Sequence, residues 1–292
     1  MFAEEWPLMM FTLISQLAIG SFIMLACVRL FLTKQEGATA SKFTNPGFKA
    51  VGALMVLSLI FSLFHLGTPT GAYRSILNLG SSWLSREILT AGGFLVFWFI
   101  SYRAYQKDNS GAQILGVVTS LIGLAAIFSM VNIYSHSIRP AWTNVNTYIA
   151  FFGATFALGS LGAAALIAYA AKGAELISAV SAQLKKISWV AIAAVVLPLI
   201  YLPVFISSLG SGNAAAQASA HLLTGSYVAV LVFRGLISLA GVGLLIYTLK
   251  RAGKKAIPLN LVYLALALVF VGEFIGRYVF YGSAVSIMIG LN

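Results

Sequence analysis

Eight long apolar segments follow one another along the chain and limit the folds that it can adopt. They cover roughly residues 8–32, 46–66, 85–104, 112–134, 146–171, 187–209, 226–249 and 258–281. Each is close to the about 20 residues that a helix needs to cross the hydrocarbon core of a bilayer. Apolar residues make up 60% of the chain, which excludes a water-soluble globular fold. The sequence therefore predicts an all-α polytopic membrane protein with eight transmembrane helices.

Basic residues alternate between the loops that join these segments. Thirteen of the 18 lysines and arginines belong to the first, third, fifth and seventh loops: Arg29, Lys34, Lys42, Lys49, Arg103, Lys107, Lys172, Lys185, Lys186, Lys250, Arg251, Lys254 and Lys255. Because lysine and arginine collect on the cytoplasmic side of a membrane, these loops are expected there and both termini outside. The net charge of +11 then comes mostly from basic residues beside anionic lipid at the cytoplasmic surface, and it does not indicate a nucleic-acid surface.

The segments between the apolar stretches are too short to hold a soluble domain. The longest of them run roughly over 33–45, 67–84, 135–145 and 210–225. We therefore expect a single integral membrane domain over residues 1–292. A division into four-helix halves, 1–140 and 145–292, stays open as an alternative.

The clear cases of ionisable side chains inside the predicted helices are Glu87, Arg234, Glu273 and Arg277. A charge at such a depth costs roughly 2.5–3.5 kcal/mol unless it is paired or hydrated, so each is a candidate site residue. Glu273 and Arg277 are four residues apart, which suits an ion pair on one helix face as well as a ligand role. Arg234 is expected to need a carboxylate from another helix, either Glu87 or Glu273.

His65 and Glu87 form the most chemically capable combination. His65 ends the second predicted helix and Glu87 lies in the first turn of the third, so both are expected near the outer face. A histidine takes up a proton near neutral pH and a nearby carboxylate can pass it to water. The combination favours proton-coupled chemistry on a lipid-soluble molecule.

Metal centres and common hydrolase sites lack their residues in this sequence. Cys27 is the single cysteine, which excludes an internal disulfide, a thiolate-held iron–sulfur cluster or a Cys-rich zinc site within the chain. The three histidines, His65, His136 and His221, all lie at outer helix boundaries, so no haem held across a bundle is expected. No HExxH, GxSxG or GxxxxGKS string occurs.

Five short strings carry a family likeness. They are EWPLMMFT at Glu5–Thr12, HLGTP at His65–Pro69, LSREI at Leu84–Ile88, RPAWTN at Arg139–Asn144 and GEFIGRYVFYG at Gly272–Gly282. In this order, and with this eight-helix spacing, the chain resembles the membrane-anchor subunit of dimethyl sulfoxide reductase over essentially its whole length. It is similar, more distantly, to the polysulfide reductase anchor.

The resemblance implies a menaquinol-oxidising anchor in a bacterial inner membrane, with both termini periplasmic. Such an anchor holds a four-cluster iron–sulfur subunit and a molybdopterin catalytic subunit, which we expect on the outer face. By position, His65 and Glu87 match the histidine and the acid of the family's menaquinol site, and Gly67 and Arg74 belong to the same site. One departure concerns Gly71, because the family often places an arginine there and the nearest basic residue of this chain is Arg74.

A secondary transporter is the alternative that the intramembrane charges leave open. Its midplane charges and broken helices give a similar sequence pattern. A transporter needs a hydrophilic cavity at mid-depth and works without partner subunits, whereas an anchor co-purifies with iron–sulfur and molybdenum polypeptides. The terminal electron acceptor and the type of quinone stay open, since the acceptor is selected in a different subunit.

Overall fold

The computed structural model describes residues 2–33, 37–64, 78–172, 178–252 and 257–288. Within these ranges the chain is helical, without strands: α1 (Phe2–Thr33), α2 (Gly37–Phe64), α4 (Trp83–Gln106), α5 (Ala112–Ser135), α6 (Val145–Ala170), α7 (Ser178–Gly210), α8 (Ala214–Thr224), α9 (Val228–Ala252) and α10 (Leu259–Gly282). All except the short α8 are long and apolar enough to cross a membrane, which makes eight spans. The prediction of an all-α, eight-span membrane protein is confirmed.

The predicted bounds are wrong at three places. Helix α2 begins nine residues before the predicted start at 46, and α7 begins nine residues before 187. The stretch 210–225, expected to be a connection, contains α8. Hydropathy detects only the part of a helix that lies in hydrocarbon, and a helix continues into the interfacial region without further apolar residues.

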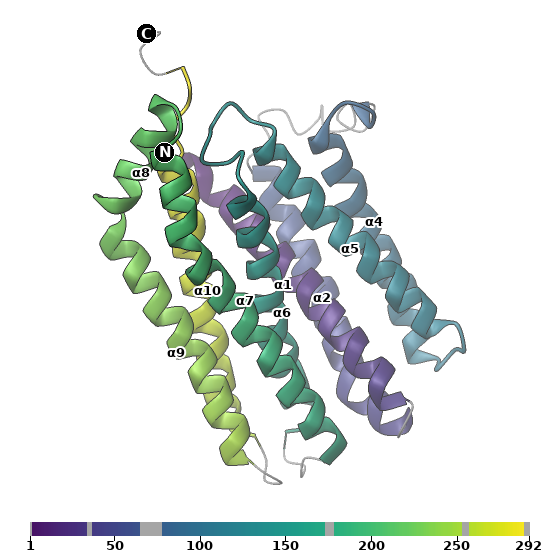
Figure 1. Ribbon diagram of the computed structural model, residues 1–292. Helices are drawn as coiled ribbons and strands as arrows, with labels where there is room; N and C mark the ends of the chain where they lie inside the picture. The colour runs from purple at the N-terminus through teal and green to yellow at the C-terminus, as the bar shows by residue number, and fades with distance from the viewer. Residues whose placement is uncertain (1, 34–36, 65–77, 173–177, 253–256, 289–292) are drawn as a thin grey trace.

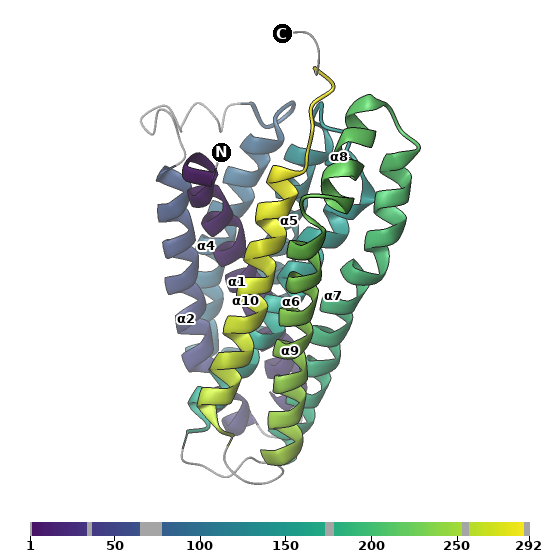
Figure 2. The same ribbon diagram turned by 90° about the vertical axis from the view of Figure 1, so that its left-hand side faces the viewer.

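The start of α1 and the end of α10 lie at the same end of the bundle (Figures 1 and 2). This end, called the termini end below, also carries the end of α2 at Phe64, the start of α4 at Trp83 and the short helix α8. At the opposite end lie Thr33, where α1 ends, and Gln106, where α4 ends. An even number of spans accounts for the common location of the first and last helix ends.

Helix α1 lies in the middle of the bundle and packs against α2, α5, α6 and α10. In its most apolar stretch, 89% of the residues are buried inside the protein. Helices α4 and α5 pack together on one side, and α9 and α10 pack together on the other. A single hydrophobic core continues from the first four spans into the last four, and the division into halves stays a prediction.

Cys27 lies in α1, and its side chain is exposed at the outside of the bundle. Hydropathy alone does not distinguish a helix face that packs on protein from one that meets lipid.

Candidate functional site

A cavity of about 410 Å³ lies between α1, α2 and α4 near the termini end. Its walls are apolar apart from one serine and one glutamate: Phe11, Val56, Leu59, Ile60, Ser62, Leu63, Leu84, Glu87, Ile88, Ala91, Gly92 and Leu95. Several of these side chains are exposed at the outside of the bundle, among them Ile60 and Leu63. The cavity therefore suits an apolar ligand that enters from the lipid and meets one acidic group.

Glu87 is the acidic group of this cavity. It is the fifth residue of α4, which begins after Ser82, whose hydroxyl accepts a hydrogen bond of 3.3 Å from the backbone N–H of Ser85. The Glu87 side chain is only 6% exposed. Within the described residues its carboxyl group has neither an ion pair nor a hydrogen bond, so it is available to a bound ligand.

The other residues predicted for this site, His65, Gly67 and Arg74, lie outside the described residues, as does Gly71. The described part of α2 ends at Phe64, one residue before His65, and its neighbour Leu63 lines the cavity. The undescribed segment is thus continuous in sequence with one wall of the cavity. The roles assigned to these residues stay predictions.

The two remaining histidines occupy the termini end without lining the cavity. His136 caps the C-terminus of α5, and its ring lies 5.6 Å from that of Trp83. Its Nδ1 is 3.0 Å from the backbone oxygen of Asn132. His221 lies in the last turn of α8. Both histidines lie at or near helix ends, as predicted, and the assignment of this end to the outer face stays a prediction.

A second polar cluster joins α9 and α10. Arg234 Nη2 lies 3.4 Å from Glu273 Oε2, so this arginine takes its carboxylate from another helix, and Glu273 is the residue that supplies it. The alternative partner, Glu87, lies in the other cavity. Gly276 makes room for the arginine, since an ideal Cβ there would lie 2.4 Å from Arg234 Nε.

The expected intrahelical ion pair between Glu273 and Arg277 is wrong. Arg277 Nη2 instead donates to Gln16 Oε1 of α1 at 3.0 Å, and its guanidinium carbon lies 3.7 Å from the Phe151 ring centroid. Gln16 in turn donates to the Phe151 backbone oxygen at 3.3 Å. A spacing of four residues permits a pair within one helix, but Arg277 joins α10 to α1 and α6.

Sequence reasoning missed a pair of buried tyrosines beside Arg277. The hydroxyl groups of Tyr134 in α5 and Tyr281 in α10 are 2.6 Å apart. Both tyrosines and Gln16 are neutral, so a search for charges inside spans does not find them. The RPAWTN string is the one sequence feature that pointed to this region. It contains Trp142, whose indole donates to the backbone oxygen of Phe280, the residue before Tyr281, at 2.9 Å.

Comparison with known proteins decides the family. The model of the DMSO reductase anchor subunit (DmsC) family matches residues 1–283. The chain belongs to the DMSO reductase anchor subunit family. It is therefore a multi-pass membrane protein with an anchoring role in a DMSO reductase complex, which implies catalytic and iron–sulfur partner subunits.

Three curated proteins, all named as anaerobic dimethyl sulfoxide reductase polypeptides, resemble this anchor subunit over nearly their whole length. The polypeptide YnfH of Escherichia coli (strain K12) is 28% identical over 288 residues, which cover 97% of this chain and 96% of the relative. A Haemophilus influenzae relative is 29% identical over 286 residues, covering 95% and 94%. A second E. coli relative is 29% identical over 289 residues, covering 97% and 96%.

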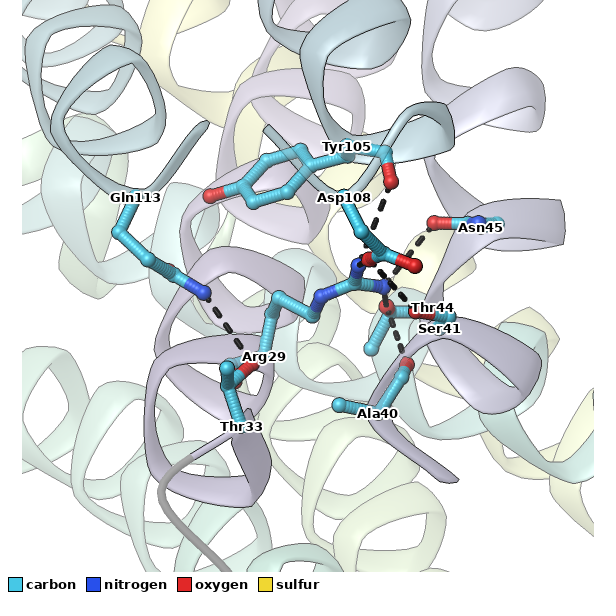
Figure 3. A network of polar contacts seen from close by, with 9 residues as sticks. All are labelled: Arg29, Thr33, Ala40, Ser41, Thr44, Asn45, Tyr105, Asp108 and Gln113. Carbon is cyan, nitrogen blue, oxygen red and sulfur yellow. Dashed lines mark hydrogen bonds and ion pairs between the residues drawn. The ribbon is translucent and has the colours of Figure 1, made fainter. Parts of the chain in front are cut away.

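The opposite end of the anchor subunit holds a third polar cluster, centred on Arg29 (Figure 3). Arg29 was assigned to a loop from the sequence, but it lies within α1 and is only 3% exposed. Its guanidinium donates to Thr44 Oγ1 at 3.0 Å, Asn45 Oδ1 at 3.1 Å and Asp108 Oδ1 at 2.5 Å. Ser41 also donates to Asp108, at 2.9 Å.

This Arg29 cluster ties three elements together. Thr44 and Asn45 belong to α2, whereas Asp108 lies in the turn between α4 and α5, where its φ of 46° is left-handed. A buried guanidinium needs several acceptors, and here α2, the turn and the Tyr105 backbone oxygen of α4, at 3.3 Å, provide them. The cluster lies at the end of the bundle opposite to the Glu87 cavity, and its contacts join α1, α2 and the turn.

Proposed function

We propose that the chain oxidises menaquinol in the cavity between α1, α2 and α4 and delivers its electrons to the iron–sulfur subunit of a DMSO reductase complex. The observation that carries the proposal is the Glu87 carboxyl group, which is buried in the wall of an otherwise apolar cavity and has no ion pair or hydrogen bond within the described residues. The volume of about 410 Å³ lies within the range of roughly 300–1,000 Å³ that small-molecule sites occupy. Apolar walls suit the naphthalene ring and the isoprenoid tail of menaquinol.

Oxidation of one menaquinol to menaquinone releases two electrons and two protons. In the proposed site His65 accepts a hydrogen bond from a quinol hydroxyl and takes up its proton, and Glu87 relays protons to water. Gly67 and Arg74, in the segment that follows α2, complete the contacts to the quinol head. The arginine often found in the family at the position of Gly71 is absent, so Arg74 is the basic residue assigned to this segment.

The two electrons pass to a four-cluster iron–sulfur subunit and from there to a molybdopterin catalytic subunit. Tunnelling weakens steeply with distance, so an anchor in which no haem is expected requires its quinol site close to the nearest cluster. We therefore assign the docking surface to the termini end, on the connections around 67–84, 135–145 and 210–225. The distribution of basic residues supports a periplasmic location of this end in a bacterial inner membrane.

Electron transfer and proton release then take place on the same side of the membrane. Neither charge has to cross the bilayer, so the quinol-oxidation step is non-electrogenic. The acceptor that the complex finally reduces is selected by its catalytic subunit.

Filling the cavity tests the proposal directly. Gly92 lines the cavity, and an ideal Cβ at this position meets nothing within 4 Å. Gly92→Phe should reduce quinol-dependent turnover at least about tenfold, because a phenyl ring occupies the space of the quinol. Activity with an artificial donor that feeds the catalytic subunit should be unchanged.

Gly243→Phe is the matched control. Gly243 also has open space around it, but it lies at an exposed position of α9, away from the Glu87 cavity. This variant should retain both activities. Normal quinol-dependent turnover in a stably accumulated Gly92→Phe complex would place menaquinol elsewhere.

A further inference from the structure

Two adjacent cavities, both bordered by α7 and α9, have no role in the proposed oxidation of menaquinol. The first is small, about 50 Å³, and its walls include the charged side chains Arg234, Glu273 and Arg277. A single water needs roughly 10–15 Å³ on the same measure, so a group the size of a phosphate fits. Asn146 and Ser283 add further polar groups to its walls.

The charges of the described residues that line this cavity do not cancel. Two guanidinium groups face one carboxylate, which leaves one excess positive charge. The hydrogen bond of Arg277 within the described residues goes to neutral Gln16, and Arg234 has a single long contact of 3.4 Å with Glu273. An uncompensated positive charge is costly at this depth of a membrane protein, and an anionic group would offset it.

The second cavity is an apolar groove of about 340 Å³ between α7 and α9. Leu202, Leu223 and Leu231 line both cavities, so the groove begins where the charged cavity ends. Along α9 the groove runs from Val228 to Leu239, ~17 Å at 1.5 Å per residue. This length matches the about 15 Å thickness of hydrocarbon in one leaflet.

We propose that an anionic phospholipid occupies these two cavities, with its phosphate beside Arg234 and Arg277 and one acyl chain in the groove between α7 and α9. A zwitterionic lipid carries a positive group in its own headgroup, so it does not compensate the excess positive charge of the cavity. A quinone is neutral and does not compensate this charge either. The site therefore selects lipids with a net negative headgroup, and it is separate from the cavity that contains Glu87.

The test uses the complete complex, reconstituted in nanodiscs in which phosphatidylglycerol replaces phosphatidylcholine at constant total lipid. A ligand that binds the folded state raises its thermal midpoint, so the midpoint should rise with the phosphatidylglycerol fraction. Native mass spectrometry after mild delipidation should show one retained phosphatidylglycerol. Arg234→Gln should weaken that binding about 10- to 100-fold, as expected for the loss of a charge-assisted hydrogen bond.

A second variant addresses the groove without changing any charge. Gly235 lines the groove, and an ideal Cβ there would lie 3.5 Å from Leu199, an ordinary contact. Gly235→Leu should therefore fold normally and lose the retained lipid, because its side chain fills the groove. Gly243→Leu and Arg251→Gln are the matched controls on the same helix, and both should keep the lipid.

Three results would overturn the proposal. The first is equal stabilisation of the wild-type complex by phosphatidylcholine and phosphatidylglycerol. The second is an unchanged amount of retained anionic lipid in both Arg234→Gln and Gly235→Leu. The third is retention of a quinone, instead of a phospholipid, that depends on Arg234.

Discussion

Gly20 of α1 and Gly159 of α6 lie against each other with no side chain between their backbones. An ideal Cβ on Gly20 would lie 2.8 Å from the Cα of Gly159, and one on Gly159 would lie 2.4 Å from the Cα of Gly20. Small residues allow such close approach of helices in membranes, where tight packing replaces the hydrophobic effect as the source of association. This crossing joins the first four spans to the last four.

Gly159→Ala should destabilise the folded anchor by about 1–3 kcal/mol, because the added methyl group overpacks a backbone contact that cannot relax through a side chain. Thermal midpoints of the detergent-solubilised complex would measure the loss. Gly243→Ala is the control, since open space surrounds Gly243, and it should leave the midpoint unchanged. A midpoint of Gly159→Ala equal to that of the wild type would show that the two helices can separate at no cost.

His65→Arg should abolish quinol-dependent turnover while the complex still assembles, because arginine cannot take up the quinol proton at neutral pH. Membranes are assayed with a reduced quinol analogue and with an artificial donor to the catalytic subunit. Only the activity with the quinol analogue should disappear. Equal loss of both would indicate misassembly and contradict a specific role of His65.

Glu87→Gln should slow quinol oxidation about 100-fold or more, the usual contribution of a general acid or base, while binding of a quinol analogue persists. Glu87→Asp should be milder, since it keeps the carboxyl group. Steady-state turnover and analogue binding, measured on the same membranes between about pH 6 and 8, separate the two effects. Unchanged turnover of Glu87→Gln across this range would make the carboxyl group structural.

The Arg234–Glu273 pair should behave as a coupled unit. Arg234→Gln and Glu273→Gln should each reduce membrane accumulation more than the double variant does, because a single change leaves a charge without its partner; such losses reach about 3–5 kcal/mol for buried pairs. Quantitative immunoblots of membranes complete the double-mutant cycle. A double variant worse than either single one would mean that one of the residues has another role.

The iron–sulfur subunit should be accessible from outside intact spheroplasts, because the proposed quinol cavity lies at the termini end of the bundle, which the basic residues predict to be periplasmic. Impermeant labelling reagents applied before and after membrane lysis measure this access. Lys107 on this chain serves as an internal reference, since it lies in the turn after α4 at the opposite end. Labelling of the iron–sulfur subunit only after lysis would contradict either the orientation or the docking surface.

Hydropathy predicted the eight spans because a bilayer requires a minimum length of apolar helix, and no other fold of this chain meets that requirement. It did not predict the early starts of α2 and α7, or α8, because helices outside hydrocarbon need no apolar signal. Residue size alone does not show which glycines make close contacts, since Gly159 meets the Gly20 backbone whereas Gly243 has open space around it.

The charged clusters were only partly predictable, because pairing depends on how helices are placed side by side. Arg234 was correctly expected to find a carboxylate on another helix, but the spacing of Glu273 and Arg277 satisfies an intrahelical pair equally well. Arg29 was assigned to a loop because it lies near the end of a span. Its partner Asp108 is 79 residues further along the chain, which no local pattern reveals.

The burial of α1 has a consequence for biosynthesis. This helix is synthesised before α6 and α10, yet those two helices cover much of its surface. A nascent chain must therefore keep α1 in the lipid, or shielded by an insertase, until α10 has been inserted. Truncated chains that lack α10 should consequently be recognised by membrane quality-control proteases, even though all their remaining spans are apolar enough to insert.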